Sequence, residues 1–219
     1  MRCPACQNPV IENDAACRHC GFTLEAADRH FGIAPSLTKP VADLVQVLSG
    51  SEKRKLDRAA QRLLNRFPQL DVAVVLAAVP AHIPLGVYAF WLFNRGQLSS
   101  ASESGGGNHL VLCVIDTATH RAAAMSGYGF EPFLPEAQLH MCLNNYSQTS
   151  QRDGITAGIL AFWKELDMQL TNIHRQIPRL YGLQGGEQDA EWRLDVADDR
   201  GEESHRAGTA HRILGDAPG

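Results

Sequence analysis

The pattern of hydrophobic and polar positions predicts four helices, over residues 51–67, 84–95, 135–147 and 153–177. In the first and last of these, apolar residues recur every three or four positions, as on one face of an amphipathic helix. Three shorter and mostly apolar runs predict strands, over 71–79, 109–115 and 121–126. A polar Ser/Gly loop is expected over 97–108, and Pro178 should end the last helix.

The order of these segments predicts a mixed sheet. Two strands joined by a crossover helix run parallel with a right-handed connection, which places Asp71 and His109 at the same end of the sheet. The short connection over 116–120 then predicts an antiparallel hairpin. The expected fold class is therefore α/β: a small N-terminal zinc ribbon followed by a layered domain with a mixed central sheet flanked by helices.

Composition divides the chain into four parts. Four of the six cysteines lie within residues 1–28, which we interpret as a separate ribbon module. Residues 29–40 contain glycine, serine and proline and suit a short semi-rigid linker. The α/β domain is expected over 41–182. The last part, 183–219, is strongly acidic and is predicted to be a mobile tail, with one short extended piece at 192–196.

Length, charge and composition indicate an ordinary globular protein. The 219 residues include 24 acidic and 20 basic ones, a net charge of -4, and 44% of them are hydrophobic. This balance excludes a polycationic nucleic-acid binder and a wholly disordered chain. The first twenty residues hold no apolar run that suits a signal peptide, and six cysteines without such a signal favour a reducing compartment. We therefore expect a cytoplasmic protein.

Other classes of function find little support in the sequence. The most apolar stretch, 70–93, is interrupted by an aspartate, a histidine and two prolines, so we expect no membrane span. Within residues 1–24 the basic side chains are Arg2 and Arg18, balanced by Glu12 and Asp14, so we expect no nucleic-acid binding. The G-x-S-x-G, H-E-x-x-H and P-loop patterns of common enzyme classes are missing.

The cysteine spacing predicts a zinc site near the start of the chain. Cys3 and Cys6 form one C-x-x-C pair, and Cys17 and Cys20 form a second one that is followed by Gly21. Four thiolates suit tetrahedral zinc, and because they fill its coordination shell we expect a structural ion rather than a catalytic one. The pattern resembles the short zinc ribbons at many bacterial N-termini. The alternatives are a thioredoxin-like redox pair at Cys3 and Cys6, or unliganded thiols.

Several short motifs between residues 41 and about 170 are similar to those of one known family. The closest is Gly-Tyr-Gly-Phe-Glu at 127–131, beside the family's Gly-Tyr-Gly-Leu-Glu. The others are Val-Ala-Asp at 41–43 with Leu-Ser at 48–49, Leu-Phe-Asn at 92–94, Asn108 before a strand, and Asp-Gly-Ile at 153–155. The chain resembles the TPM-domain family, which includes a thylakoid-lumen acid phosphatase and bacterial membrane-anchored relatives. The resemblance implies a TPM-like layered domain and allows a phosphatase activity.

Oxygen-bearing side chains are expected to gather at one end of the sheet. The returning strand of the hairpin ends near Gly127, which places Glu131 beside Asn108 and Asp71, with Asp43 as a further candidate. Such a cluster suits calcium or magnesium. Each residue also fits a structural role at a strand end, in a turn or in solvent. We expect these structural roles over a metal site, because no tight carboxylate spacing accompanies them.

The predicted helix over 51–67 carries a basic surface. Between residues 51 and 66 there are six basic and two acidic side chains, a net charge of +4, whereas nine acidic and four basic residues from Gly185 onward give -5. A tether raises the effective concentration of weak contacts. We therefore expect the tail to compete with an acidic partner for this helix at low ionic strength.

Two hypotheses about function follow. The first is a non-enzymatic protein-interaction or assembly module in the cytoplasm, with another protein as its partner. It agrees with a closed zinc site and with the lack of a recognisable pair of nucleophile and base. The second is a metal-assisted phosphatase acting on phosphomonoesters, which would use the oxygen cluster and which the TPM resemblance allows. We prefer the first.

Overall fold

The structure is a computed structural model that describes residues 2–11, 14–37, 39–98, 108–130 and 132–180. The chain divides into two units, residues 1–173 and 174–219, and the first holds the whole sheet and the six cysteines. The second unit begins within the last helix. In chain order the elements are α1 (Leu24–Phe31), β1 (Val41–Asp43), α2 (Gly50–Arg66), β2 (Asp71–Ala77), α3 (Leu85–Arg95), β3 (Leu110–Asp116), β4 (Arg121–Ser126), α4 (Glu136–Asp153) and α5 (Ile155–Leu180).

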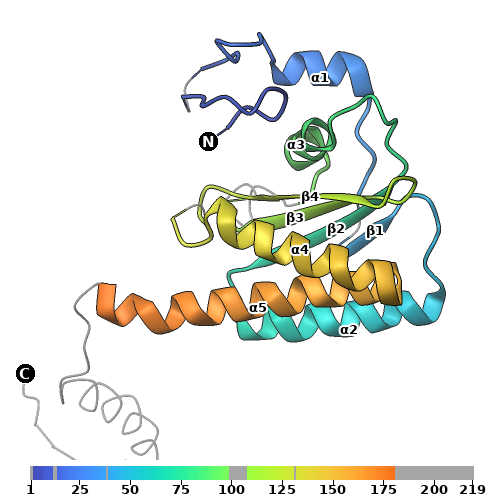
Figure 1. Cartoon of the computed structure of the whole chain (residues 1–219), viewed down its shortest axis with the longest axis vertical. Helices are drawn as coiled ribbons and strands as arrows, with labels where there is room; N and C mark the ends of the chain where they lie inside the picture. Colours follow the sequence, from blue (N-terminus) through green and yellow to red (C-terminus); the bar gives the residue numbers. More distant parts are fainter. Residues whose placement is uncertain (1, 12–13, 38, 99–107, 131, 181–219) are drawn as a thin grey trace, which may run out of the picture. The chain divides into compact units, whose positions relative to one another are not determined.

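A four-stranded sheet with the order β1-β2-β3-β4 forms the centre of the first unit (Figure 1). The first three strands are parallel and β4 is antiparallel to β3, so the predicted mixed sheet of the α/β class is confirmed. The two middle strands are buried along their length apart from Asp71, as their continuous apolar runs predict. β1 was not predicted from the sequence, because three residues are too few to show a period of two.

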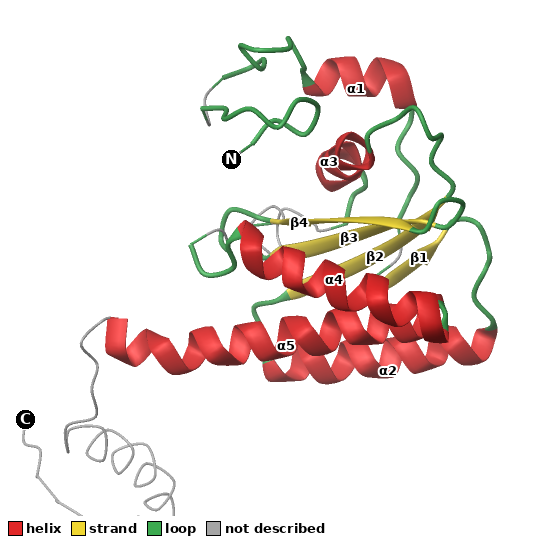
Figure 2. Ribbon diagram, viewed as in Figure 1, coloured by secondary structure: helices red, strands yellow, loops and turns green. Residues whose placement is uncertain are grey.

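Helices cover both faces of the sheet (Figure 2). On one face, apolar residues of α2, of α4 and of α5 up to residue 173 form one core. On the other face, α3 packs on the sheet and α1 packs on α3, which gives a second core. Successive side chains of a strand point to opposite faces. β2 therefore serves both cores, the first with Val72, Val74 and Leu76 and the second with Ala73, Val75 and Ala77.

The four predicted helices are present, with differences at their ends. α5 runs to Leu180, so the prediction that Pro178 ends it was wrong. α2 begins after Ser49, whose hydroxyl accepts a hydrogen bond from the Glu52 N–H while the Glu52 carboxylate accepts one from the Ser49 N–H. α4 continues to Asp153, beyond the predicted end at 147. It stops there because Gly154 has a φ of 86°, a conformation that side-chain-bearing residues avoid. This single glycine separates α4 from α5.

Residues 24–37 differ from the predicted arrangement of a separate ribbon and a linker. Thr23 caps a helix, α1, by accepting a hydrogen bond from the Ala26 N–H at 3.0 Å, and this helix crosses the expected boundary between residues 28 and 29. Ala27 and Leu37 are buried in the same core as β2 and α3. The segment therefore packs as part of the TPM-like domain, because its apolar side chains have a partner surface that the sequence alone does not display.

The predicted acidic tail over 183–219 and its extended piece at 192–196 lie outside the described residues. The basic helix that they were expected to shield is α2. Its Arg54, Arg58 and Arg62 are exposed, and the spacing of four places them along one face of the helix. Within the described part of the chain, the apolar stretches of the helices are all too short to cross a bilayer.

Candidate metal centre and adjoining cavity

The two C-x-x-C pairs form two turns of the same local geometry. In the first, the Gln7 N–H donates to the Cys3 carbonyl at 2.9 Å, and in the second, the Gly21 N–H donates to the Cys17 carbonyl at 2.8 Å. Gln7 and Gly21 both have positive φ, 62° and 69°. Glycine takes this conformation without strain and glutamine does not, so the sequence shows the second turn more clearly than the first.

The turns bring the four sulfur atoms together. The Sγ atoms of Cys3, Cys6, Cys17 and Cys20 all lie within 4.8 Å of one another, and the Cys3–Cys20 and Cys6–Cys17 pairs are each 3.7 Å apart. A tetrahedral zinc ion with four Zn–S bonds of 2.3 Å would require sulfur atoms about 3.8 Å apart. The four cysteines therefore fit a single tetrahedral metal ion.

Hydrogen bonds to Cys6 favour its thiolate form, which is the form that binds a metal cation. The backbone N–H of Asn8 and then its side-chain amide, 3.5 Å from Cys6 Sγ, lower the pKa of the Cys6 thiol to about 6. For Cys20, the backbone N–H of Phe22 acts in the same direction. Burial and the other thiols outweigh it and raise the pKa of Cys20 to about 12. Four thiolates this close repel one another, so full ionisation needs a cation among them.

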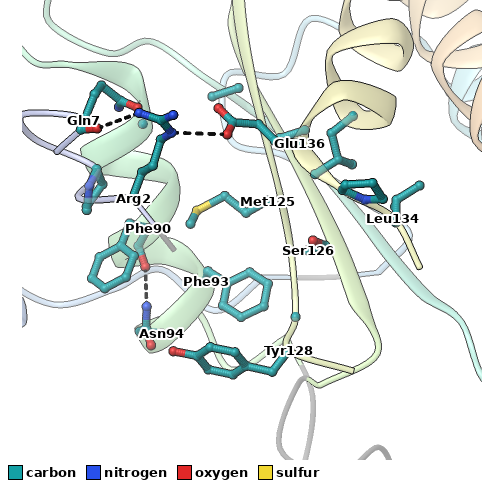
Figure 3. A pocket seen from close by; sticks show the side chains of 17 residues that line it. Arg2, Gln7, Phe90, Phe93, Asn94, Met125, Ser126, Tyr128, Leu134 and Glu136 are labelled. Atoms are coloured by element: carbon teal, nitrogen blue, oxygen red, sulfur yellow. Dashed lines mark hydrogen bonds and ion pairs between the residues drawn. The ribbon is translucent and has the colours of Figure 1, made fainter. Parts of the chain in front are cut away.

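A cavity of about 480 Å³ borders the chain segment that carries the first C-x-x-C pair (Figure 3). One wall consists of Arg2, Pro4 and Gln7, which adjoin the ligands Cys3 and Cys6. The remaining walls come from α3, from β4 with the turn after it, and from the start of α4. The segment of the first C-x-x-C pair thus borders a hollow that the ribbon and the α/β domain enclose together.

One polar contact crosses this cavity from the ribbon to the domain, and a second one holds the same side chain within the ribbon. Arg2 Nε lies 3.6 Å from the Glu136 carboxylate at the start of α4, and Arg2 Nη1 donates to the Gln7 carbonyl at 3.2 Å (Figure 3). Both side chains of the ion pair are more than half exposed, so the pair contributes little stability by itself. In the sequence Arg2 is one of two basic residues near the cysteines, and no motif indicates its place at a cavity.

The predicted oxygen cluster does not form as a group of four. Asp43, at the end of β1, stands opposite Leu76, and Asp71, at the start of the parallel strand β2, stands opposite Leu110. Five residues of strand separate the two positions, or about 16 Å. Asp43 is the last residue of β1 and Asp71 is the first residue of β2. Because the two strands are parallel, these residues lie at opposite ends of the sheet, and including Asp43 in the cluster was wrong.

Each of these aspartates has a structural partner. Asp43 accepts hydrogen bonds from the N–H groups of Val47 and Leu48 and pairs with Lys53 Nζ at 3.2 Å. Burial alone would raise the pKa of Asp43, but these donors hold it below its usual value. Asp71 pairs with Lys39 Nζ at 2.5 Å.

The other two members of the predicted cluster are only partly visible. Asn108 is exposed and lies at the Asp71 end of the sheet, where its carbonyl accepts the Gly129 N–H at 2.9 Å. Next to it, the rings of His109 and Phe130 pack edge to face at 5.7 Å. Glu131 lies outside the described residues. Among the described residues, the cysteine cluster is the one group of three or more His, Cys, Asp or Glu side chains suited to hold a metal ion.

A fully buried carboxylate at the far end of the sheet was not singled out from the sequence. Asp116 accepts hydrogen bonds from the N–H groups of Val79 and Ala118, at 3.2 Å each, and from the side chains of Thr119 and Arg121. Burial opposes its ionisation, but these donors keep the pKa of Asp116 below the usual value. With its acceptor sites used in this way, Asp116 fixes the β3–β4 turn. The sequence signal for this residue was an aspartate at the end of a run of apolar strand residues.

The fold and the cysteine cluster define an α/β protein with a mixed four-stranded sheet, helices on both faces and a four-cysteine ribbon before it. Residues 41–169, more than half of the chain, match the TPM domain, and the chain belongs to the TPM-domain family. The resemblance inferred from the short motifs is thus confirmed.

A comparison with solved structures found similar chains in two bacteria. BA42 from the psychrophile Bizionia argentinensis has 12% sequence identity and a TM-score of 0.51, over 59% of this chain and 86% of that one. The N-terminal domain of a protein from P. gingivalis has 18% identity and a TM-score of 0.46, over 60% of this chain and 82% of that one. At this identity the likeness to BA42 concerns the fold alone. A search of curated proteins found no match.

Proposed function

We propose that this chain is a cytoplasmic protein-interaction module in which one structural zinc ion fixes the ribbon against the TPM domain. The observation that carries the proposal is the position of the cysteine cluster. Arg2, Pro4 and Gln7 adjoin its ligands and form one wall of a cavity whose other walls belong to the TPM domain. A metal ion at this place sets the shape of a surface and has no open coordination position for a substrate.

The choice of zinc rests on the donor set. Four thiolates in two C-x-x-C turns are the ligands of structural zinc sites, and the 3.7 Å separations of the sulfur pairs suit its tetrahedral shell. The alternative of a redox pair at Cys3 and Cys6 is less well supported. In a redox pair these two sulfurs would act together, whereas here each lies 3.7 Å from a sulfur of the other C-x-x-C pair.

The phosphatase alternative draws its support from the family resemblance. Catalysis by a metal-assisted phosphatase requires carboxylates that converge on a cation. Asp43 and Asp71 stand at opposite ends of the sheet, and each is already engaged by a lysine. A hydrolytic site built on these two residues would need both ion pairs to break and the sheet to rearrange.

The cytoplasmic location is part of the proposal. The six cysteines of the chain form no disulfide, which suits a reducing compartment. A thiolate-bound metal site also persists better where thiols are kept reduced.

Two assays on the full-length protein test the proposed function. Tagged protein and its Cys17→Ser variant are used to recover partners from cell extract, and the purified proteins are offered phosphomonoesters with magnesium, calcium or chelator. We expect at least one stoichiometric protein partner, reduced recovery by Cys17→Ser, and no turnover. The His19→Ala variant is the matched control, since His19 is exposed within the second turn and should leave both metal and partner in place. Turnover that Asp71→Asn abolishes would replace the proposal with the phosphatase.

A further inference from the structure

The outer edge of β4 carries backbone groups that point away from the sheet. The Gly127 N–H donates to the Leu110 carbonyl at 2.9 Å, which fixes the phase of the β3–β4 ladder. In an antiparallel pair, residues alternate between those that bond to the neighbouring strand and those that do not. The N–H and C=O groups of Ala122, Ala124 and Ser126 are therefore directed outward. Among the described strands, β3 is the one that pairs with β4.

This edge lacks the features that usually protect edge strands. Natural proteins guard exposed edges with charged side chains, prolines or bulges, since an unguarded edge is a template for another strand. From residue 122 to 126 the sequence is Ala-Ala-Ala-Met-Ser, without charge, proline or bulge, and the pairing with β3 is continuous. A charged residue, Arg121, is found only at the start of the strand.

The cavity lies along the same edge and offers apolar contacts on both sides of it. On the α3 side, Ala123 and Met125 face Phe90 and Phe93, and Figure 3 shows Met125 pointing towards these rings. On the other side, Ala124 belongs to the core that includes Leu134 and Leu139 at the start of α4. A strand placed beside β4 would therefore find apolar surface for the side chains of both its faces.

We propose that an extended segment of a partner protein adds to the outer edge of β4 as a fifth strand. Its backbone would bond to Ala122, Ala124 and Ser126, and an apolar side chain would enter between Phe93 and Met125. The segment is about five residues long, with apolar side chains on both of its faces, one towards α3 and the other towards α4. This inference rests on the proposed interaction function and names the chemistry of the partner.

A single extended segment fits this edge better than a second copy of the chain does. Both α3 and α4 contact β4 and flank its edge, one on each face of the sheet. A second copy pairing through its own β4 would bring the same two helices along. On each side of the joined sheet, a helix of one copy would then face a helix of the other. These helices would compete for the space beside β4, whereas a slender peptide needs that space only for its side chains.

The test uses full-length, metal-loaded protein and a phage-displayed library of random 12-residue peptides. We expect selected peptides with a run of about five mostly apolar residues that protect the outward backbone amides of Ala122, Ala124 and Ser126 from hydrogen exchange. N-methylation along the best peptide should then lower affinity at every second position by at least about tenfold, and leave the intervening positions unaffected. A period of two in this scan is a property of strand addition and does not depend on how any protein variant folds.

Two protein variants complete the test. Ala124→Pro removes an outward N–H and should lower peptide affinity at least tenfold, and Phe93→Ala should lower it by removing a wall of the apolar contact. The matched control is Arg58→Ala on α2, which should bind the peptides unchanged. A library without binders, an N-methyl scan without period, or protection at another surface would overturn the inference. A natural partner that Ala124→Pro still recovers would overturn it too, and would leave the proposed function standing.

Discussion

Asp28 of α1 accepts hydrogen bonds from two guanidinium nitrogens of Arg95, which is 67 residues away on α3, and the shortest of these is 2.6 Å. The same carboxylate accepts the indole N–H of Trp91 at 3.1 Å. The hydrogen bond from Arg95 lowers the pKa of Asp28, and Trp91 acts in the same direction. Desolvation opposes them but does not prevail, so the pKa of Asp28 stays below its usual value. This contact joins the helix that follows the ribbon to the layer that packs on the sheet.

Replacing Asp28 tests whether this contact holds α1 in place. In Asp28→Ala the buried Trp91 loses the acceptor of its indole N–H and Arg95 loses a bidentate partner. We expect a melting temperature lower by a few degrees and faster hydrogen exchange in α1. Asp153→Ala, which breaks the exposed pair with Arg152, is the control and should melt like the native chain. Unchanged exchange in α1 would show that the contact is dispensable.

Metal binding is expected at one ion per chain. Because α1 shares a core with α3 and β2, loss of the metal should affect more than the ribbon. In Cys17→Ser, elemental analysis should give well under one zinc per chain, and hydrogen exchange should rise over residues 2–11 and in α1. His19→Ala should retain the metal in full. Full zinc occupancy in Cys17→Ser would refute the assignment of the ligands.

The capping box of α2 predicts a dependence of stability on pH. The Ser49 hydroxyl and N–H, and then the Thr156 hydroxyl, lower the pKa of Glu52 from 4.5 to about 2. A carboxylate with a lowered pKa stabilises the folded state when ionised, so its contribution is complete above pH 4.5 and is lost as the pH falls towards 2.

The Glu52→Gln variant checks this dependence. Urea unfolding measured between pH 6 and pH 2, a range chosen to span both values, should show a shallower loss of stability in the variant than in the native chain. Asp57→Asn, an exposed carboxylate on the same helix, is the control and should follow the native curve. Equal slopes for Glu52→Gln and the native chain would contradict the prediction.

Gly129 is expected to be intolerant of a side chain. A Cβ at this position would lie 2.7 Å from the His109 ring and 2.8 Å from the Asn108 carbonyl oxygen, so the backbone after β4 would have to move. Gly129→Ala should lower the free energy of unfolding by about 1–3 kcal/mol, measured by urea denaturation. At Gly86 the nearest atom is the Pro4 carbonyl oxygen at 3.5 Å, an ordinary contact. Gly86→Ala should therefore be close to neutral, and equal losses in the two variants would refute the steric argument.

The sequence was sufficient where the physical cause is local. The pattern of apolar residues located α2, α3, β2 and β3 to within a few residues, because these elements bury one face or both along their whole length. The order of strands and crossover helix also gave the parallel pairing of β2 with β3. The cysteine spacing brought the four sulfurs to one place, since each C-x-x-C turn positions its own two ligands.

The candidate cation site shows where such reasoning stops. Asp43 was grouped with Asp71 because β1 was not recognised, and a three-residue strand has too short a pattern to predict its direction or register. Once the register is known, the two aspartates stand at opposite ends of the sheet. Asp71 pairs with Lys39 and Asp43 pairs with Lys53. Both pairs depend on how loops and helix ends fold, and no sequence motif predicts them.

By itself, then, the sequence determined the helices α2 to α5, the strands β2 to β4, the mixed sheet, the family and the four-cysteine site, because each depends on residues that are close in the chain or on rules of strand connection. Only the tertiary structure placed Arg2 near Glu136, packed α1 on α3 through Asp28 and Arg95, and set the outer edge of β4 beside a cavity. These contacts join residues far apart in sequence. Their existence depends on how whole surfaces fit together, and no local pattern records that fit.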